Sequence, residues 1–234
     1  MKKLVTVFAA CAVAGLVMAA DGVPSNVVGY VKTPGENGYT VFAPMFCGCL
    51  DTPMTLGAIT GDFAEWVDSL QVLDAGLVAS DSYVWVDVTY SGATPVWTSD
   101  FGTDDSGVIV PRGAAVIISS TATIIGNAGE VEAKDIIIDC DPGYTVLGNP
   151  TPVPITLGDI KFTGLEEWID SLQLLDAGLV ASDSYVWVDV TYSGATPVWT
   201  SDFGTDDSGI PLDPGAGFIL SSVNGSKVTF PSAL

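Results

Sequence analysis

Two short loops hold the residues of this chain that are best suited to bind a metal ion. The first loop, residues 98–107, contains Asp100, Asp104 and Asp105 together with glycines, and no lysine or arginine lies nearby. The loop recurs at residues 200–209 with Asp202, Asp206 and Asp207. Carboxylate oxygens are the ligands that Ca2+ prefers, although the spacing differs from that of an EF-hand loop. The alternative is a pair of acidic turns without an ion, because aspartate side chains readily bond their own backbone in turns.

Aromatic side chains of the same segments are candidates for carbohydrate binding. The first set is Tyr83, Trp85, Tyr90 and Trp97, and it recurs as Tyr185, Trp187, Tyr192 and Trp199. Aromatic rings fill the cores of small β proteins more often than they serve as binding surfaces, since each buries a large apolar area. We expect most of these rings to be buried. Trp85 and Trp187 are the candidates for stacking on sugar rings if one face of the sheet is exposed.

The cysteines suggest a disulfide rather than a metal site. Cys47, Cys49 and Cys140 lie beyond the N-terminal apolar segment, and the chain contains no histidine. A zinc site would therefore lack ligands. In an exported chain three cysteines predict one disulfide and one thiol that is free or pairs between chains. We expect either Cys47 or Cys49 to pair with Cys140.

No catalytic signature is present. Nucleophilic catalysis needs a serine, cysteine or threonine beside a base, and the chain has no histidine and few lysines. Glycoside hydrolysis needs two placed carboxylates, but pairs of carboxylates occur in any acidic β protein. We find no phosphate-binding glycine loop and no dinucleotide fingerprint. The sequence predicts a protein that is not an enzyme.

A repeat organises the chain. Residues 68–107 and 170–209 are identical except that Leu174 replaces Val72, so 39 of 40 positions agree. The flanking segments align but have diverged, which predicts two modules at 24–128 and 129–234 from an internal duplication. Two explanations remain open for the near-identity. Either a recent gene conversion copied the block, or both modules must present the same surface.

Within each module the pattern of residues is that of short strands. β-branched and aromatic residues alternate across residues 82–90, and a hairpin turn is expected at residues 74–76. Residues 63–69 have a mixed pattern that also fits a short helix. Short strands separated by glycine, proline and aspartate predict an all-β fold of two tandem small β-sandwich or barrel-like domains.

The N-terminus predicts export. Lys2 and Lys3 precede an apolar run at residues 4–18, and small residues follow at Ala19 and Ala20. This order is typical of a secretory signal peptide, assigned here to residues 1–20. The alternative, a retained membrane anchor, is disfavoured because the run is shorter than the roughly 20 residues needed to span a bilayer. We expect a secreted protein, extracellular or at the cell surface, without membrane insertion.

The charge excludes some partners. The chain has 28 acidic and 7 basic residues, and two of the basic ones lie in the signal peptide, which leaves 5 − 28 = −23 after cleavage. Such a surface repels phosphate backbones, so nucleic-acid binding is not expected.

Several short motifs resemble those of a known group of proteins. They include Ser-Asn-Val-Val-Gly-Tyr at residues 25–30, Gly-Tyr-Thr-Val at 38–41 and Pro-Gly-Ala-Gly-Phe at 214–218. With these motifs the chain resembles secreted repeat proteins of unknown function from planctomycete and verrucomicrobial bacteria. The resemblance implies an exported, surface-associated protein and supplies no functional residues.

Together these patterns predict a secreted structural protein, a subunit of an extracellular surface layer, filament or matrix that binds copies of itself. The alternative is a bivalent carbohydrate-binding or adhesive module. Exposed Trp85 and Trp187 would favour the alternative, whereas exposed unpaired strands would favour assembly.

Overall fold

The computed structural model describes residues 28–34, 38–46, 54–73, 79–111, 113–121, 124–175 and 181–234. The predicted signal peptide, Cys47, Cys49 and the predicted turn at residues 74–76 lie outside these ranges. Within them the regular structure is β strand, apart from two 3-10 helices of three residues, η2 (Leu56–Ala58) and η3 (Leu157–Asp159). The prediction of an all-β fold is confirmed.

The strands fall into two sets of ten that follow one another along the chain. The first set is β1 (Val28–Pro34), β2 (Gly38–Phe42), β3 (Met54–Thr55), β4 (Ile59–Gly61), β5 (Ser69–Leu73), β6 (Ala79–Val86), β7 (Val96–Thr98), β8 (Ile109–Val110), β9 (Val116–Ser120) and β10 (Ile124–Glu130). The second set is β11 (Ile136–Cys140), β12 (Gly143–Gly148), β13 (Ile155–Thr156), β14 (Lys161–Thr163), β15 (Ser171–Leu175), β16 (Ala181–Val188), β17 (Val198–Thr200), β18 (Pro211–Leu212), β19 (Gly217–Ser222) and β20 (Ser226–Phe230).

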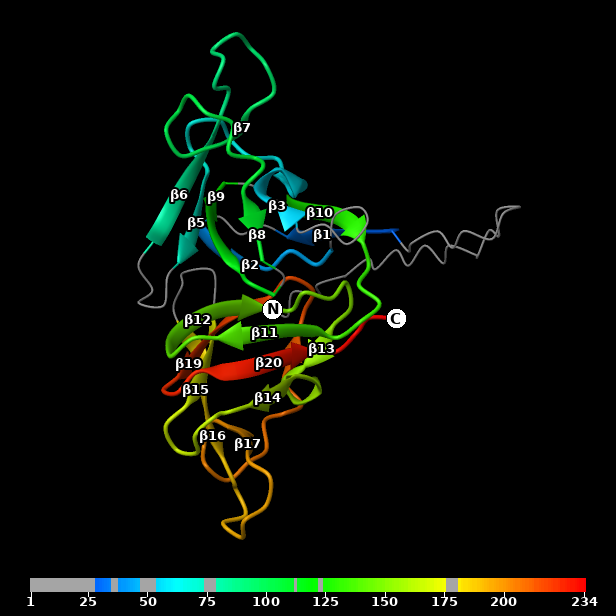
Figure 1. Cartoon of the computed structure of the whole chain (residues 1–234), viewed down its shortest axis with the longest axis vertical. Coiled ribbons are helices and arrows are strands. Elements are labelled where there is room, and N and C mark those ends of the chain that lie inside the picture. Colours follow the sequence, from blue (N-terminus) through cyan, green and yellow to red (C-terminus); the bar gives the residue numbers. More distant parts are fainter. Residues whose placement is uncertain are drawn as a thin grey trace, which may run out of the picture.

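Each set forms three antiparallel sheets with the same strand order. The five-stranded sheets run β2-β9-β5-β6-β7 and β12-β19-β15-β16-β17. The three-stranded sheets run β1-β10-β4 and β11-β20-β14, and the two-stranded sheets pair β3 with β8 and β13 with β18. In each half the sheets surround one apolar core, so the barrel-like prediction is confirmed (Figure 1). The predicted boundary between residues 128 and 129 lies within β10.

The near-identical blocks form the same strands in the same register. Trp85 of β6 lies opposite Trp97 of β7, and Trp187 of β16 lies opposite Trp199 of β17. Trp97 and Trp199 are fully buried, and each is among the largest side chains of its core. The origin of this correspondence by duplication remains a prediction from the sequence repeat.

Two local predictions were wrong. The strand expected at residues 82–90 ends at Val86, because the chain turns at Asp87, whose carboxylate accepts hydrogen bonds from the backbone that follows. The segment at residues 63–69 is a turn rather than a helix. Trp66 has a positive φ of 65°, which no right-handed helix accommodates.

The two halves pack on each other through equivalent surfaces. Val41, Ala43, Ala115, Ile117, Val146 and Ile219 form a shared apolar cluster. The Ala43 amide donates to the Gly215 carbonyl at 3.0 Å, and the equivalent Gly148 amide donates to the Gly113 carbonyl at 3.2 Å. These two hydrogen bonds are the same contact with the two halves exchanged, as in the isologous interface of a two-fold dimer.

This arrangement points the near-identical blocks toward opposite ends of the molecule, although Leu73 and Leu175 in these blocks still pack against the shared cluster. β2 and β12 lie near the middle, whereas the loops that join β6 to β7 and β16 to β17 reach the two ends of the long axis (Figure 1). The two halves thus meet at the central interface and extend from it in opposite directions.

Candidate functional site

The aspartates predicted to bind a cation accept hydrogen bonds from their own loop. The Asp100 carboxylate accepts from the amides of Gly102 at 2.9 Å and Thr103 at 2.7 Å, and these bonds lower its pKa to about 2. Asp105 accepts from both the amide and the hydroxyl of Ser99 at 2.7 Å. The second copy has the same bonds at the aspartates Asp202 and Asp207.

The third aspartate of each loop has a separate partner. Asp104 accepts from the Ser106 amide, and Asp206 accepts from the Ser208 amide, both at 2.9 Å. In the part of the chain that the structure describes, no three acidic or cysteine side chains converge as metal ligands would. The aspartates therefore shape these turns, and calcium binding stays a prediction.

The predicted sugar-stacking tryptophans lie at the margin of the two cores. Trp85 is half-buried, and its ring contacts Trp97 edge-on at 5.1 Å and Phe63 at 5.6 Å. Trp187 likewise contacts Trp199 at 5.1 Å and Phe162 at 6.2 Å. Of the four aromatic residues expected in each block, Tyr90 and its equivalent Tyr192 are the exposed ones.

Tyr90 belongs to a different aromatic cluster, on the surface. Trp66 stacks on Phe101 with ring centroids 5.7 Å apart and an interplanar angle of 16°, and it lies 5.9 Å from Tyr90 at 31°. The exposed fractions of Trp66, Tyr90 and Phe101 are 51%, 67% and 44%. We call these three residues an aromatic triad. The second triad is Trp168, Tyr192 and Phe203, with exposed fractions of 50%, 68% and 45%.

The triads share an unusual backbone conformation. Their six members have φ between 54° and 68°, and in the described ranges no other residue except glycine has a positive φ. This region is uncommon for residues with a side chain, and a bulky side chain makes it more so. Each such residue costs about 1–3 kcal/mol and persists only where its surroundings fix it. Strain of this kind concentrates at functional sites.

An aspartate fixes each strained turn. The buried Asp87 carboxylate accepts five hydrogen bonds around Tyr90, from the hydroxyl and amide of Thr89 and from three later amides. The Thr89 hydroxyl bond is the main reason why the pKa of Asp87 lies well below its usual range. Asp100 likewise holds the turn that carries Phe101.

The turn that carries Trp66 is held from two sides. Buried Asp68 accepts from the Ala64 amide at 2.8 Å and from the Thr121 amide at 2.9 Å. The Trp66 amide donates to the Trp85 carbonyl at 2.9 Å, and the Tyr90 hydroxyl donates to the Phe101 carbonyl at 3.2 Å. Hydrogen bonds and ring contacts thus connect the three residues of a triad, although they come from three separate loops.

Sequence reasoning missed Trp66, Phe101, Trp168 and Phe203. A signal was available for Phe101, a large apolar residue between Asp100 and Gly102 in a run of turn-forming residues. A second signal was that a Glu-Trp pair occurs in both copies just outside the near-identical blocks, at Trp66 and at Trp168. What the sequence did not reveal is that these positions meet.

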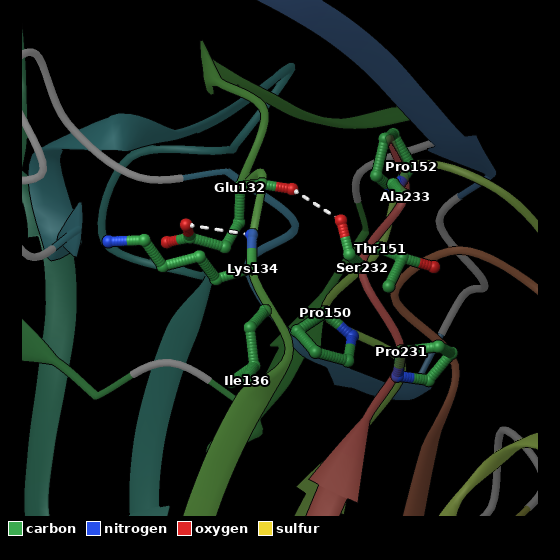
Figure 2. Close-up of a pocket in the computed structure, with 9 residues that line it drawn as sticks. All are labelled: Glu132, Lys134, Ile136, Pro150, Thr151, Pro152, Pro231, Ser232 and Ala233. Carbon is green, nitrogen blue, oxygen red and sulfur yellow. Dashed lines mark hydrogen bonds between the residues drawn. The ribbon is translucent and has the colours of Figure 1, made fainter.

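A small pocket lies elsewhere, between the segment after β10 and the C-terminus. Figure 2 shows its lining, which includes Glu132, Lys134, Pro150 and Pro231, and it encloses no space that could hold a water molecule. Typical small-molecule sites measure about 300–1,000 Å³. The Ser232 hydroxyl donates to the Glu132 carbonyl across it at 3.4 Å. None of the aspartates or tryptophans predicted as site residues lines this pocket.

Cys140, at the end of β11, has a buried thiol whose pKa is raised by burial. Its predicted partners, Cys47 and Cys49, lie outside the described residues, so the disulfide stays a prediction.

The chain matches no protein-family model, no curated protein and no solved structure. Among the described residues, no helix has the length and apolar character needed to cross a membrane.

Proposed function

We propose that this chain is a secreted, non-enzymatic structural protein that joins two neighbours within an extracellular surface layer, filament or matrix. The observation that carries the proposal is the same exposed aromatic triad at both ends of the molecule. Exposed apolar clusters mark interaction sites, and strained backbone favours the same interpretation. Two equal sites at opposite ends suit a connector, because both can be occupied at once.

The position of Trp66 favours the explanation that both modules must present the same surface over the explanation that a gene conversion copied the block. Trp66 and Trp168 lie outside the near-identical blocks, in segments where Phe63 and Ala64 are replaced by Leu165 and Glu166. The tryptophans and the glutamates before them are nevertheless the same. A gene conversion limited to the block would not explain why they were kept.

The central interface suits a connector that transmits force. It combines an apolar cluster with equivalent backbone hydrogen bonds between the halves. A packed interior of this kind resists deformation, so the distance and direction between the two ends are fixed.

The second candidate is a bivalent carbohydrate-binding or adhesive protein. The exposure of Trp66, Tyr90 and Phe101 favours it, since exposed aromatic rings can stack on sugar rings. It shares the two-ended geometry with the first candidate and differs in the ligand.

The experiment distinguishes binding to one envelope fragment from bridging between two fragments. The mature protein is mixed with washed envelope fragments of the producing cells, and sedimentation reports binding while light scattering reports aggregation. The wild-type protein should do both. A variant with Trp66→Ala and Tyr90→Ala should still sediment with the fragments but should not aggregate them, because one end remains intact.

A variant that also carries Trp168→Ala and Tyr192→Ala should do neither. The matched control is the pair Tyr39→Ala and Tyr144→Ala, two equivalent exposed tyrosines outside the triads, which should behave as wild type. Aggregation that survives the loss of either triad would overturn the proposal.

A further inference from the structure

We infer that each aromatic triad binds arginine side chains of a basic partner segment. This inference rests on the proposed connector function and names the chemistry of the ligand. The arguments are the charge around the triads, the flatness and exposure of their rings, and the fixed position of the nearby carboxylates.

The charge at both ends is of one sign. Each near-identical block contains seven aspartates and no basic residue. Asp68 and Asp87 are buried, whereas Asp81, Asp100 and Asp104 are exposed. The basic residues beyond the signal peptide lie in other segments: Lys32, Arg112, Lys134, Lys161 and Lys227. A surface of this kind attracts cationic partners and disfavours contact with a second acidic end, because like charges brought together are repelled. We therefore do not infer that a second copy of this chain binds at the triads.

The rings suit a planar cation. Although Trp66 and Phe101 stack on each other, all three rings of the triad stay exposed, and Tyr90 is the most exposed. Guanidinium groups stack on aromatic faces and are more weakly hydrated than ammonium groups, so arginine is favoured over lysine at such a site.

The carboxylates lie next to the rings in the chain and are held by the fold. Asp100 precedes Phe101, and Glu65 precedes Trp66 and accepts from the Asp87 amide through Oε1 at 3.0 Å. Because hydrogen bonds fix these groups before a ligand arrives, little ordering is needed on binding. The turns that carry Phe101 and Trp66 therefore each contain an acidic residue held in place by hydrogen bonds.

The test uses the mature protein and two fluorescent peptides of equal charge, hepta-arginine and hepta-lysine, followed by anisotropy. Hepta-arginine should bind with two peptides per chain and about fivefold more tightly than hepta-lysine, in the range expected for stacking on aromatic rings. The Trp66→Ala, Tyr90→Ala, Trp168→Ala and Tyr192→Ala variant should lose that preference. It should retain the weak, salt-sensitive binding that charge alone supports. The Tyr39→Ala and Tyr144→Ala control should bind as wild type.

An equal affinity for the two peptides, or an arginine preference that survives the triad variant, would overturn the inference. Cellohexaose serves as the neutral probe, and binding of this sugar at the triads in place of hepta-arginine would also overturn it. The two proposals fail separately. Triad-dependent aggregation of envelope fragments without arginine binding would contradict only the inferred ligand. Arginine binding without aggregation would contradict only the proposed connector function.

Discussion

The ends and the centre of this molecule differ in how far their two copies have diverged. The blocks that reach the ends, residues 68–107 and 170–209, differ at one position. At the central interface, Ala43 and Ala115 of one half correspond to Gly148 and Gly217 of the other. In the centre one copy packs against the other, so a larger residue on one side requires a smaller one across the interface: a Cβ added at Gly148 would lie 2.7 Å from the Cβ of Ala43. Packing between the halves therefore explains the divergence of the centre, but it does not require the ends to be identical.

The largest effect is expected when the centre loses a large side chain. Phe42 is fully buried at the junction of the halves, and its ring carbon would lie 3.2 Å from a Cβ added at Gly215. Phe42→Ala should lower the free energy of unfolding by about 3–5 kcal/mol, measured by urea denaturation. Phe101→Ala, at an exposed end position, should change it by less than about 1 kcal/mol. Equal losses would show that the ends contribute to stability as the centre does.

A smaller effect is expected from one added methyl group. A Cβ at Gly217 would lie 1.9 Å from Cγ1 of Val41 in the other half, whereas a Cβ at Gly209, at an end, meets no described atom within 4 Å. Gly217→Ala should cost about 1–3 kcal/mol through overpacking. The melting temperature should then fall by about 2–4 °C for each kcal/mol. Gly209→Ala is the control and should melt within about 1 °C of wild type. A normal melting temperature for Gly217→Ala would mean that the halves pack less tightly.

The smallest effect concerns acid. The pKa of Asp100 falls from 3.8 to about 2 because the folded loop donates hydrogen bonds to its carboxylate, and Asp202 behaves alike. A lowered pKa means that the unfolded chain binds protons first, so this stabilisation is present above pH 4 and is lost as the pH falls toward 2. The variant with Asp100→Asn and Asp202→Asn should therefore show a weaker dependence of stability on pH between 4 and 2, measured by denaturation at fixed pH values. An unchanged dependence would show that these bonds do not form in solution.

Much of the fold could be predicted because it rests on local patterns. Alternating β-branched and aromatic residues gave β6 and β16, and the repeat gave two halves with the same strands. The strand predicted past Val86 was wrong because its pattern continues through Tyr90, while the Asp87 carboxylate bends the chain. A periodic pattern does not report a hydrogen bond between a side chain and its own turn.

The sequence by itself determined an all-β chain with a strongly acidic surface and two copies of one block. The tertiary structure decided which aromatic residues reach the surface and how the two halves are oriented relative to each other. Trp85 and Trp66 have the same side chain, yet one packs on Trp97 and the other stacks on Phe101 in solvent. The physical reason is distance along the chain. Trp66, Tyr90 and Phe101 come from three loops, and folding alone brings those loops together.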